Sequence, residues 1–163
     1  MKAIFYATST GNTELIANKI KEKLDDFELI DISSDGVKKI NDCESVIMGV
    51  STWGDGDLMD DWEDCFEDLK EIDFTGKKLA IFGLGDQYGY EDTFVDAMGI
   101  IYEVVKENGA QIYGQTSTSG YDYDQSKAEI NDEFVGLVID EDNQAELTDS
   151  RIENWCKEIS NIQ

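Results

Sequence analysis

A short hydroxyl-rich segment near the start of the chain has the residue types of an anion-binding turn. It lies between the apolar run at 4–7 and a segment of helical spacing that begins at Glu14, and it consists of Thr8, Ser9, Thr10, Gly11, Asn12 and Thr13. A helix start leaves backbone N–H groups unpaired and carries partial positive charge, and glycine lets the backbone approach a ligand. We therefore expect a phosphate at this turn. The alternative is a helix start that Thr10 caps, with nothing bound.

The same segment contains no Lys or Arg. A phosphate would be held by neutral donors and would keep its charge. The P-loop of nucleoside triphosphatases, G-x-x-x-x-G-K-[ST], requires a lysine, so the sequence argues against triphosphate chemistry.

Two further loops combine glycine with an aromatic side chain. With the segment 8–13 as the first loop, the second loop contains Ser51, Thr52, Trp53, Gly54, Asp55, Gly56 and Asp57. The third loop contains Gly83, Leu84, Gly85, Asp86, Gln87, Tyr88, Gly89 and Tyr90. Trp53 and Tyr90 suit a flat ring bound between them. The alternative is that both aromatic side chains only cover the ends of the core. The G-x-G of the third loop is not a dinucleotide fingerprint. Its next glycine is one residue too far along the chain, and the motif follows the fourth strand rather than the first.

Strands and helices alternate along the chain and position these loops. Apolar runs predict strands over 2–7, 46–50 and 79–83, and the run at 46–50 is apolar throughout, which is typical of a parallel strand covered on both faces. Alternating apolar and polar residues predict an edge strand over 27–32. Helical spacing predicts helices over 14–24, 59–70, 94–105 and from Thr148, the expected N-cap of the last helix. The final strand appears twice, at 111–116 and 134–139, which we interpret as one strand interrupted by an inserted lobe at about 119–133.

This alternation predicts an α/β protein with a doubly wound, five-stranded parallel sheet. In such sheets ligands bind beyond the carboxyl ends of the strands, at the point where the strand order reverses. The loops after strands one, three and four should meet there.

Composition limits the chemistry. The 163 residues fit one domain over 1–163, with no signal peptide or membrane-length apolar run, so we expect a cytoplasmic protein. Histidine is absent, which removes imidazole bases and the commonest metal ligand. We expect no catalytic residues and no metal site. Three cysteines, Cys43, Cys65 and Cys156, are too few for a four-thiolate cluster and are expected to be buried thiols.

The chain is strongly acidic, with 37 acidic side chains against 13 basic ones and a net charge of -24. Nucleic acid and anionic membrane surfaces would repel it, so its partners should be basic. The alternative is that the charge only secures solubility.

In these motifs and their order, the chain resembles the flavodoxin family. The segment 8–13 is similar to the family's FMN phosphate loop, and the loops at 51–55 and 83–90 are similar to its two ring-binding loops. The insertion, with Gly120-Tyr121-Asp122-Tyr123, resembles that of long-chain members. The resemblance implies that FMN binds at the switch point between the first and third strands, as it does in this family. The chain departs from the long-chain pattern at two positions. Many long-chain members have proline before the threonine and a bulkier residue after the tryptophan, whereas this chain has Ser51 and Gly54, as short-chain members do.

The resemblance implies a three-layer α/β/α fold with non-covalently bound FMN. Residues 8–13 would hold the phosphate, and Trp53 and Tyr90 would sandwich the isoalloxazine. The backbone of Gly54, Asp55, Leu84 and Asp86 would meet the ring edge, and Thr52 and Asp140 would lie near the ribityl chain.

The implied function is a low-potential one-electron carrier that shuttles between semiquinone and hydroquinone and turns over no substrate of its own.

We expect the Gly54 peptide to flip so that its carbonyl accepts a hydrogen bond from flavin N5–H. We also expect carboxylates to lower the second potential, each by about 70 mV at ~10 Å and an effective dielectric constant of ~20. The candidates are Asp55, Asp57, Asp60, Asp61 and Asp86.

Partners implied by the resemblance are ferredoxin/flavodoxin reductases and low-potential oxidoreductases with basic surfaces, which a monomer would serve. The acidic helix at 59–70 would steer them, with an effect that weakens in salt.

Three other functions are compatible with parts of this pattern. An FMN-dependent NAD(P)H:quinone reductase has the same fold but needs a basic site for the nucleotide's phosphates, which the chain does not evidently supply. A receiver domain needs an acidic cluster after the first strand and an Asp ending the third, where Ser9 and Ser51 stand. A cofactor-free interaction module would be colourless.

Overall fold

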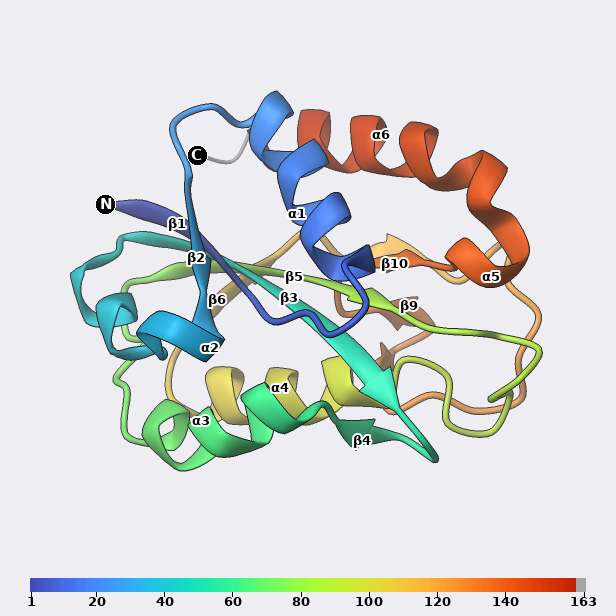
Figure 1. The fold of residues 1–163 in the computed structure, drawn as a ribbon, viewed down its shortest axis with the longest axis horizontal. Helices are drawn as coiled ribbons and strands as arrows, with labels where there is room; N and C mark the ends of the chain where they lie inside the picture. The colour runs from blue at the N-terminus through green and yellow to red at the C-terminus, as the bar shows by residue number, and fades with distance from the viewer. Residues whose placement is uncertain (161–163) are drawn as a thin grey trace.

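A parallel sheet runs through the centre of the molecule with helices on both faces (Figure 1). The structure, a computed structural model, describes residues 1–160. The sheet has the order β10-β5-β3-β1-β2, and its strands are β1 (Lys2–Tyr6), β2 (Glu28–Asp31), β3 (Ser45–Trp53), β5 (Lys78–Leu84) and β10 (Leu137–Ile139). Neighbours along this path pair in parallel. The predicted α/β class and doubly wound sheet are confirmed.

The last strand is divided, as the two apolar runs indicated. β6 (Gln111–Tyr113) pairs with the first residues of β5, and β10 pairs with its last residues, both in parallel. Gly114, at φ 80°, turns the chain out of the sheet directly after β6, so the first half of the strand ends three residues earlier than predicted.

Two helices cover each face of the sheet. Figure 1 shows α1 (Asn12–Lys23) and α6 (Thr148–Ser160) on one face and α3 (Asp60–Lys70) and α4 (Asp96–Glu107) on the other. Successive side chains of β1 point to opposite faces, so Ile4 packs with α1 and α6 while Phe5 packs with α3 and α4. The sheet is therefore buried on both sides, as the uninterrupted apolar runs predicted.

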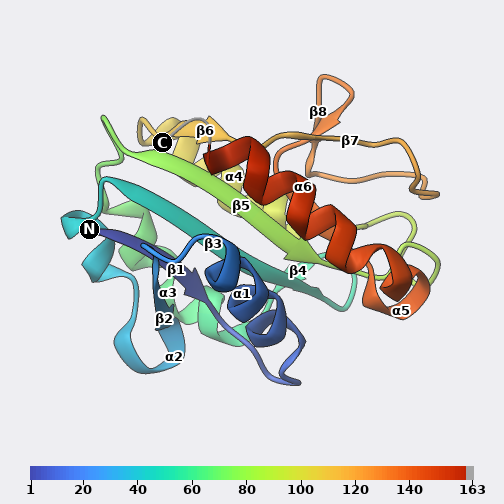
Figure 2. The ribbon, with the colours of Figure 1, turned by 90° about the horizontal axis from the view of Figure 1, so that it is seen from above.

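The inserted lobe is a small antiparallel sheet of its own. It contains β7 (Thr116–Ser117), β8 (Glu129–Ile130) and β9 (Glu133–Phe134) in the order β7-β9-β8, and Figure 2 shows it beside α4, beyond the edge of the main sheet. Its rings Tyr121, Tyr123 and Phe134 cluster around Phe94 with centroids 5.1–6.1 Å apart. The lobe occupies all the residues between β6 and β10, more than the 119–133 predicted.

Two predicted boundaries are wrong for local reasons. The edge strand ends at Asp31, because that carboxylate accepts the Ser33 N–H at 2.9 Å and caps a short helix, α2 (Ile32–Asp35). Thr148 does not cap α6. It is the first helical residue after a 3₁₀ turn (Ala145–Leu147), and its buried hydroxyl has no hydrogen-bond partner among residues 1–160.

The cysteines are free thiols. Cys43 and Cys156 are buried, as predicted, and Cys65 on α3 is half-buried. Burial raises the pKa of the Cys156 thiol to about 11. No helix in the described part of the chain is long and apolar enough to cross a membrane.

Candidate functional site

An open cleft lies at the edge of the sheet where β1, β3 and β5 end. Its lining residues come from the loops after these three strands and from α5 (Glu141–Gln144), and Figure 1 shows the three strands running toward the side of the molecule where α5 lies. The cleft has a volume of about 190 Å³ and is lined by Thr10, Asn12, Ser51, Thr52, Trp53, Leu84, Gly85, Asp86, Tyr90, Glu141 and Asp142. Nine of its eleven lining residues belong to the three loops in which the sequence predicts a ligand site, and their contacts with a ligand stay predictions.

The first loop presents an open helix start. Gly11 adopts the left-handed conformation at φ 91° and is the N-cap of α1, with no side chain capping the helix. The first helical bond runs from the Leu15 N–H to the Gly11 carbonyl at 3.0 Å, so the three preceding N–H groups have no helical acceptor. Thr10 does not cap the helix, so the alternative in which Thr10 is the N-cap and nothing is bound is wrong about the cap. Glycine takes the cap, and Thr10 lines the cleft instead.

Hydroxyl groups join the first loop to the second. The Thr13 and Ser51 hydroxyl oxygens lie 2.5 Å apart, and Thr13 is buried. The Thr8 hydroxyl accepts the Gly11 N–H at 2.9 Å and fixes the turn from within. These hydrogen bonds hold the start of α1, with its N–H groups that have no helical acceptor, beside the end of β3.

The second loop is a tight hairpin that leaves its tryptophan exposed. β3 runs to Trp53, and β4 (Asp57–Leu58) pairs with it in antiparallel fashion. Gly54 and Gly56 have φ values of 52° and 98°, which explains why glycine occupies both positions. Trp53 at the start of this turn is 39% exposed, which is unusual for so large an apolar side chain.

The third loop is ordered by Asp86. Its Oδ1 accepts the N–H groups of Tyr88 at 3.1 Å and Gly89 at 2.8 Å, and the Asn143 side-chain amide at 2.8 Å. The Gly89 N–H and then the Asn143 amide hold the pKa of this carboxyl below its usual range, so it stays ionised. The loop ends at Tyr90, which is 44% exposed. Two exposed aromatic rings thus come from separate loops of one cleft.

The cleft carries negative charge. Three carboxylates, Asp86, Glu141 and Asp142, line it, and no Lys or Arg is among the described lining residues. Burial raises the pKa of Asp142, and the charges of Asp86 and Asp140 add to the rise. Sequence reasoning missed Glu141 and Asp142. Their signal was their place directly after the last strand, which ends at the same edge.

Asp140 is brought close to the cleft but not to its surface. It is fully buried and accepts the Gln87 side-chain amide at 2.6 Å, the Gln87 N–H at 3.2 Å and the Asn143 N–H at 3.0 Å. Its carboxylate therefore holds the third loop and α5 together. Gly83 is also internal, because a Cβ there would lie 2.3 Å from Met98 Cγ.

The remaining predicted residues belong to the three loops without lining the cleft in this structure, and their contacts with a ligand stay predictions. They are Thr8, Ser9, Gly11, Thr13, Gly54, Asp55 and Gly56.

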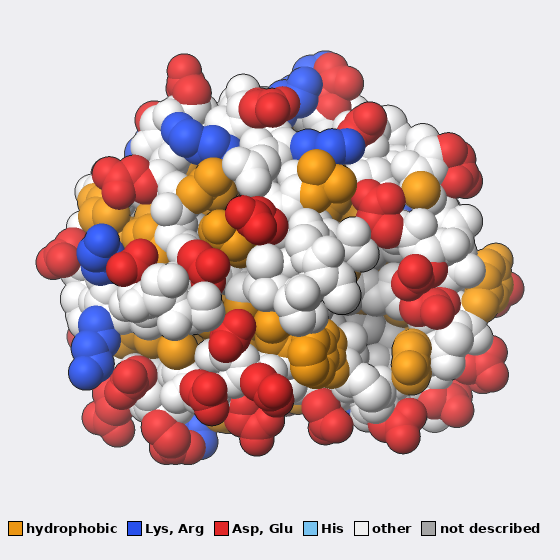
Figure 3. All heavy atoms as spheres, in the orientation of Figure 1, with side chains coloured by type: hydrophobic (Ala, Val, Ile, Leu, Met, Phe, Trp, Pro, Cys, Tyr) orange, Lys and Arg blue, Asp and Glu red, His pale blue; other side chains and the backbone are white. Residues whose placement is uncertain are grey.

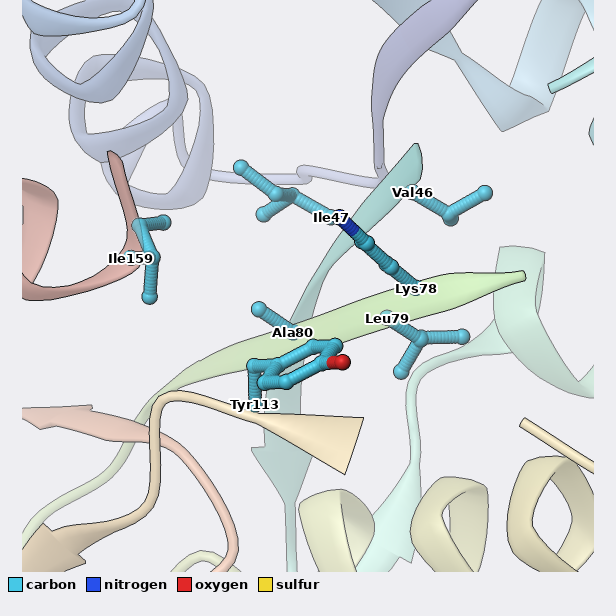
Figure 4. A pocket seen from close by; sticks show the side chains of 7 residues that line it. All are labelled: Val46, Ile47, Lys78, Leu79, Ala80, Tyr113 and Ile159. Carbon is cyan, nitrogen blue, oxygen red and sulfur yellow. The ribbon is translucent and has the colours of Figure 1, made fainter. Parts of the chain in front are cut away.

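A second cavity lies at the opposite end of the sheet. Figure 4 shows its lining of Val46, Ile47, Lys78, Leu79, Ala80, Tyr113 and Ile159. Its volume of about 10 Å³ has room for about one water molecule, so it is a packing defect of the core rather than a ligand site. No group of three metal-ligating side chains occurs within residues 1–160.

Fold and cleft together define a class of protein. It is a doubly wound α/β protein whose ligand site, beyond the ends of β1, β3 and β5, suits a flat ring between two aromatic side chains and an anionic tail on a helix start.

Comparison with known proteins gives the family. A sequence model of the family described as flavodoxin matches residues 4–155. A flavodoxin of Synechocystis sp. is 47% identical over 98% of this chain and 95% of its own, and one of Trichodesmium erythraeum is 48% identical over 96% and 94%. The crystal structure of a Fusobacterium nucleatum flavodoxin mutant bound to flavin mononucleotide superposes with a TM-score of 0.94 at 37% identity, covering 98% of this chain and 94% of that one. The chain belongs to the flavodoxin family, whose members are electron-transfer proteins rather than enzymes.

Proposed function

We propose that this chain holds FMN non-covalently in the cleft and acts as a low-potential carrier of single electrons between redox enzymes. The observation that carries the proposal is the pair of exposed rings, Trp53 and Tyr90, on two loops of one cleft whose described lining residues include no cation. The FMN-bound Fusobacterium nucleatum flavodoxin, at 37% identity, supports the choice of cofactor.

The donor set of the cleft fits FMN. The N–H groups at the start of α1 and the Thr10 hydroxyl offer neutral donors for a phosphate, and Asn12 lies beside them. Trp53 and Tyr90 offer two faces for a flat ring, and Leu84 and Gly85 line the cleft with them. When bound, FMN supplies one-electron chemistry, and the protein supplies orientation and electrostatics.

The charge of the cleft supports a low potential. Adding an electron to a group in this cleft adds negative charge near Asp86, Glu141 and Asp142, with no lining cation to offset it. Coulomb repulsion therefore destabilises the reduced state relative to the same group in water. Asp86, whose pKa is lowered, contributes throughout the neutral range.

Removing the aromatic rings tests the cofactor assignment. We expect wild-type protein to bind one FMN, and Trp53→Ala and Tyr90→Ala each to weaken binding by about 10- to 100-fold, since stacking on an aromatic ring contributes roughly 1–3 kcal/mol. Quenching of FMN fluorescence measures the affinity. Tyr113→Ala, which removes a ring from β6, is the control. A wild-type protein that leaves FMN fluorescence unchanged would refute the assignment.

Gly54 is expected to tune the two electron steps. A Cβ at this position would meet only Asp57 Oδ2, at 3.8 Å, so space is not limiting and the φ of 52° alone demands glycine. Gly54→Ala should hinder rearrangement of the turn and narrow the gap between the two one-electron midpoint potentials. Gly36→Ala, at φ 66° with nothing within 4 Å, introduces similar backbone strain far from the cleft. Equal gaps in both variants would show that Gly54 has no such role.

The acidic surface supports basic partners such as ferredoxin/flavodoxin reductases and low-potential oxidoreductases. Figure 3 shows acidic side chains concentrated along the edge where α3 and α4 run in Figure 1, and α3 contains Asp60, Asp61, Glu63, Asp64, Glu67 and Asp68. Free thiols are consistent with a reducing compartment, and we assign a cytoplasmic monomer.

The rate of electron transfer to a basic reductase should fall as salt rises. A rate independent of salt in stopped-flow measurements would exclude electrostatic steering.

The reductase alternative gains nothing from the cleft. Its described lining contains no Lys or Arg that could hold the phosphates of a nicotinamide nucleotide. The relatives are named as flavodoxins.

A further inference from the structure

The segment Thr93–Asp96, directly before and at the start of α4, contacts both aromatic loops from behind the cleft. A Cβ placed on Gly56 of the second loop would lie 2.8 Å from Asp96 Oδ2 and 3.2 Å from Thr93 Cβ. A Cβ placed on Gly85 of the third loop would lie 2.8 Å from Val95 Cγ1. Each loop thus meets the segment at a glycine with no spare room, so the segment fixes how far apart the two loops can lie.

This segment has a backbone conformation that local preference does not supply. Val95 has a φ of 48°, in the left-handed region, and its side chain is only 1% exposed. A β-branched residue rarely adopts this conformation, which persists only where surrounding contacts impose it.

The inserted lobe provides those contacts from the other side. The Phe94 N–H donates to the Gln125 carbonyl at 3.2 Å, and the Ser126 hydroxyl donates to the Phe94 carbonyl. The Lys127 N–H donates to Asp96 Oδ1 at 2.7 Å. The lobe also packs closely on α4, since a Cβ on Gly99 would lie 2.3 Å from the Lys127 carbonyl oxygen.

The buried Asp96 carboxylate joins these two sets of contacts. Its Oδ1 accepts from the lobe, and its Oδ2 faces Gly56 of the second loop. It forms no ion pair with the described residues, although its burial raises its pKa. An apolar side chain would fill the space at lower desolvation cost, so the observed reason for a polar side chain here is the Oδ1 acceptor that it offers to the Lys127 N–H.

We propose that Thr93–Asp96 sets the spacing of the two aromatic loops, with Asp96 as the positioning residue, and that residues 125–127 of the inserted lobe hold this segment in place. The lobe is then part of the cofactor site without touching the cofactor. The inference rests on the proposed binding of FMN.

The first test compares three variants of the full chain. Asp96→Ala removes the acceptor of the Lys127 N–H and the side chain that packs against Gly56, and it should weaken FMN binding about tenfold or more. Asp96→Asn keeps an oxygen for the Lys127 N–H and should recover most of this loss. Asp92→Ala removes an equal charge from an exposed side chain nearby that makes no hydrogen bond within residues 1–160, and it should change the affinity less than threefold.

A second readout separates positioning from general stability. In wild-type protein, FMN binding should slow hydrogen exchange at the Phe94 and Lys127 amides, because loops that close on the segment also stabilise its bonds to the lobe. The amides of β8 and β9, which belong to the lobe but not to this contact, serve as an internal reference. Asp96→Ala should abolish the slowing at Lys127.

The outcomes are distinguishable. Affinities for Asp96→Ala and Asp92→Ala that agree within threefold, or exchange at Phe94 and Lys127 that FMN leaves unchanged, would overturn the inference while FMN binding stands. A wild-type protein that binds no FMN overturns both the inference and the proposed function. If Asp96→Ala does not fold, Ser126→Ala replaces it. That variant loses the hydroxyl that donates to the Phe94 carbonyl and also accepts the Ala128 N–H within the lobe. It should weaken FMN binding several-fold, and an unchanged affinity would count against the proposal.

Discussion

The double variant Glu141→Gln/Asp142→Asn should raise the second, more negative one-electron midpoint potential of the FMN-loaded protein by roughly 100–150 mV. Both carboxylates line the cleft, and its lining residues within 1–160 include no cation that their loss would leave unpaired. One charge at about 10 Å and an effective dielectric constant of about 20 contributes roughly 1.7 kcal/mol, or about 70 mV. The reduced state carries more negative charge, so removing repulsion stabilises it and the potential rises.

A matched pair of substitutions at the other end of the sheet controls for net charge. Asp42→Asn/Glu107→Gln removes the same two charges from exposed positions before β3 and at the end of α4. Screening by salt should hold its effect to about 20 mV. Potentiometric titration at about pH 8, where carboxylates are ionised, measures both. Equal shifts in the two variants would mean that the local charge of the cleft does not set the potential.

Gly136→Ala should be the most destabilising conservative substitution proposed for this chain. A Cβ there would lie 1.8 Å from the carbonyl oxygen of Ile81 in the neighbouring strand, and backbone atoms cannot swing aside as a side chain can. We expect a loss of at least about 3 kcal/mol in the free energy of unfolding, and a fall in Tm of roughly 10 °C. Thermal unfolding of the FMN-free protein measures it.

Gly76→Ala is the control for this prediction. Gly76 has a φ of 79° and nothing within 4 Å of an added Cβ, so its substitution introduces backbone strain without a clash. It should cost about 1 kcal/mol. If Gly136→Ala proved no more harmful than Gly76→Ala, the close approach of the chain before β10 to β5 would be wrong.

The fold was largely predictable from the sequence because periodicity reports which faces of an element are buried. The uninterrupted apolar run at 46–50 indicated a strand covered on both faces, and β3 is such a strand. The two apolar runs at 111–116 and 134–139 indicated one strand in two pieces, and both pieces pair with β5. Boundaries were harder, since Gly114 and Asp31 end strands through turn geometry that periodicity does not contain.

The cleft was predictable as a set of loops but not at the level of single side chains. Asp140 and Asp142 are two residues apart, yet one is buried among hydrogen bonds and the other lines the cleft. Which of them faces a ligand depends on how α5 begins, not on residue type. Gly83 packs against Met98 of α4, a contact between distant parts of the sequence that gives a structural reason for glycine besides the predicted ligand.

The segment behind the cleft could not be predicted at all. Valine has a low preference for the left-handed region, so Val95 gives no sequence signal of its conformation. The contacts that impose it come from residues 125–127, about thirty positions further on. Only the assembled tertiary structure connects the lobe with the two aromatic loops.

Stepwise reduction of the purified protein with bound FMN, followed by its visible spectrum, tests the central claim most directly. The account predicts that FMN stays bound without a covalent link and takes up two electrons in separate steps, the second at a markedly more negative potential than the first. A second step at or above the potential of the first, or a protein that does not retain FMN, would contradict it.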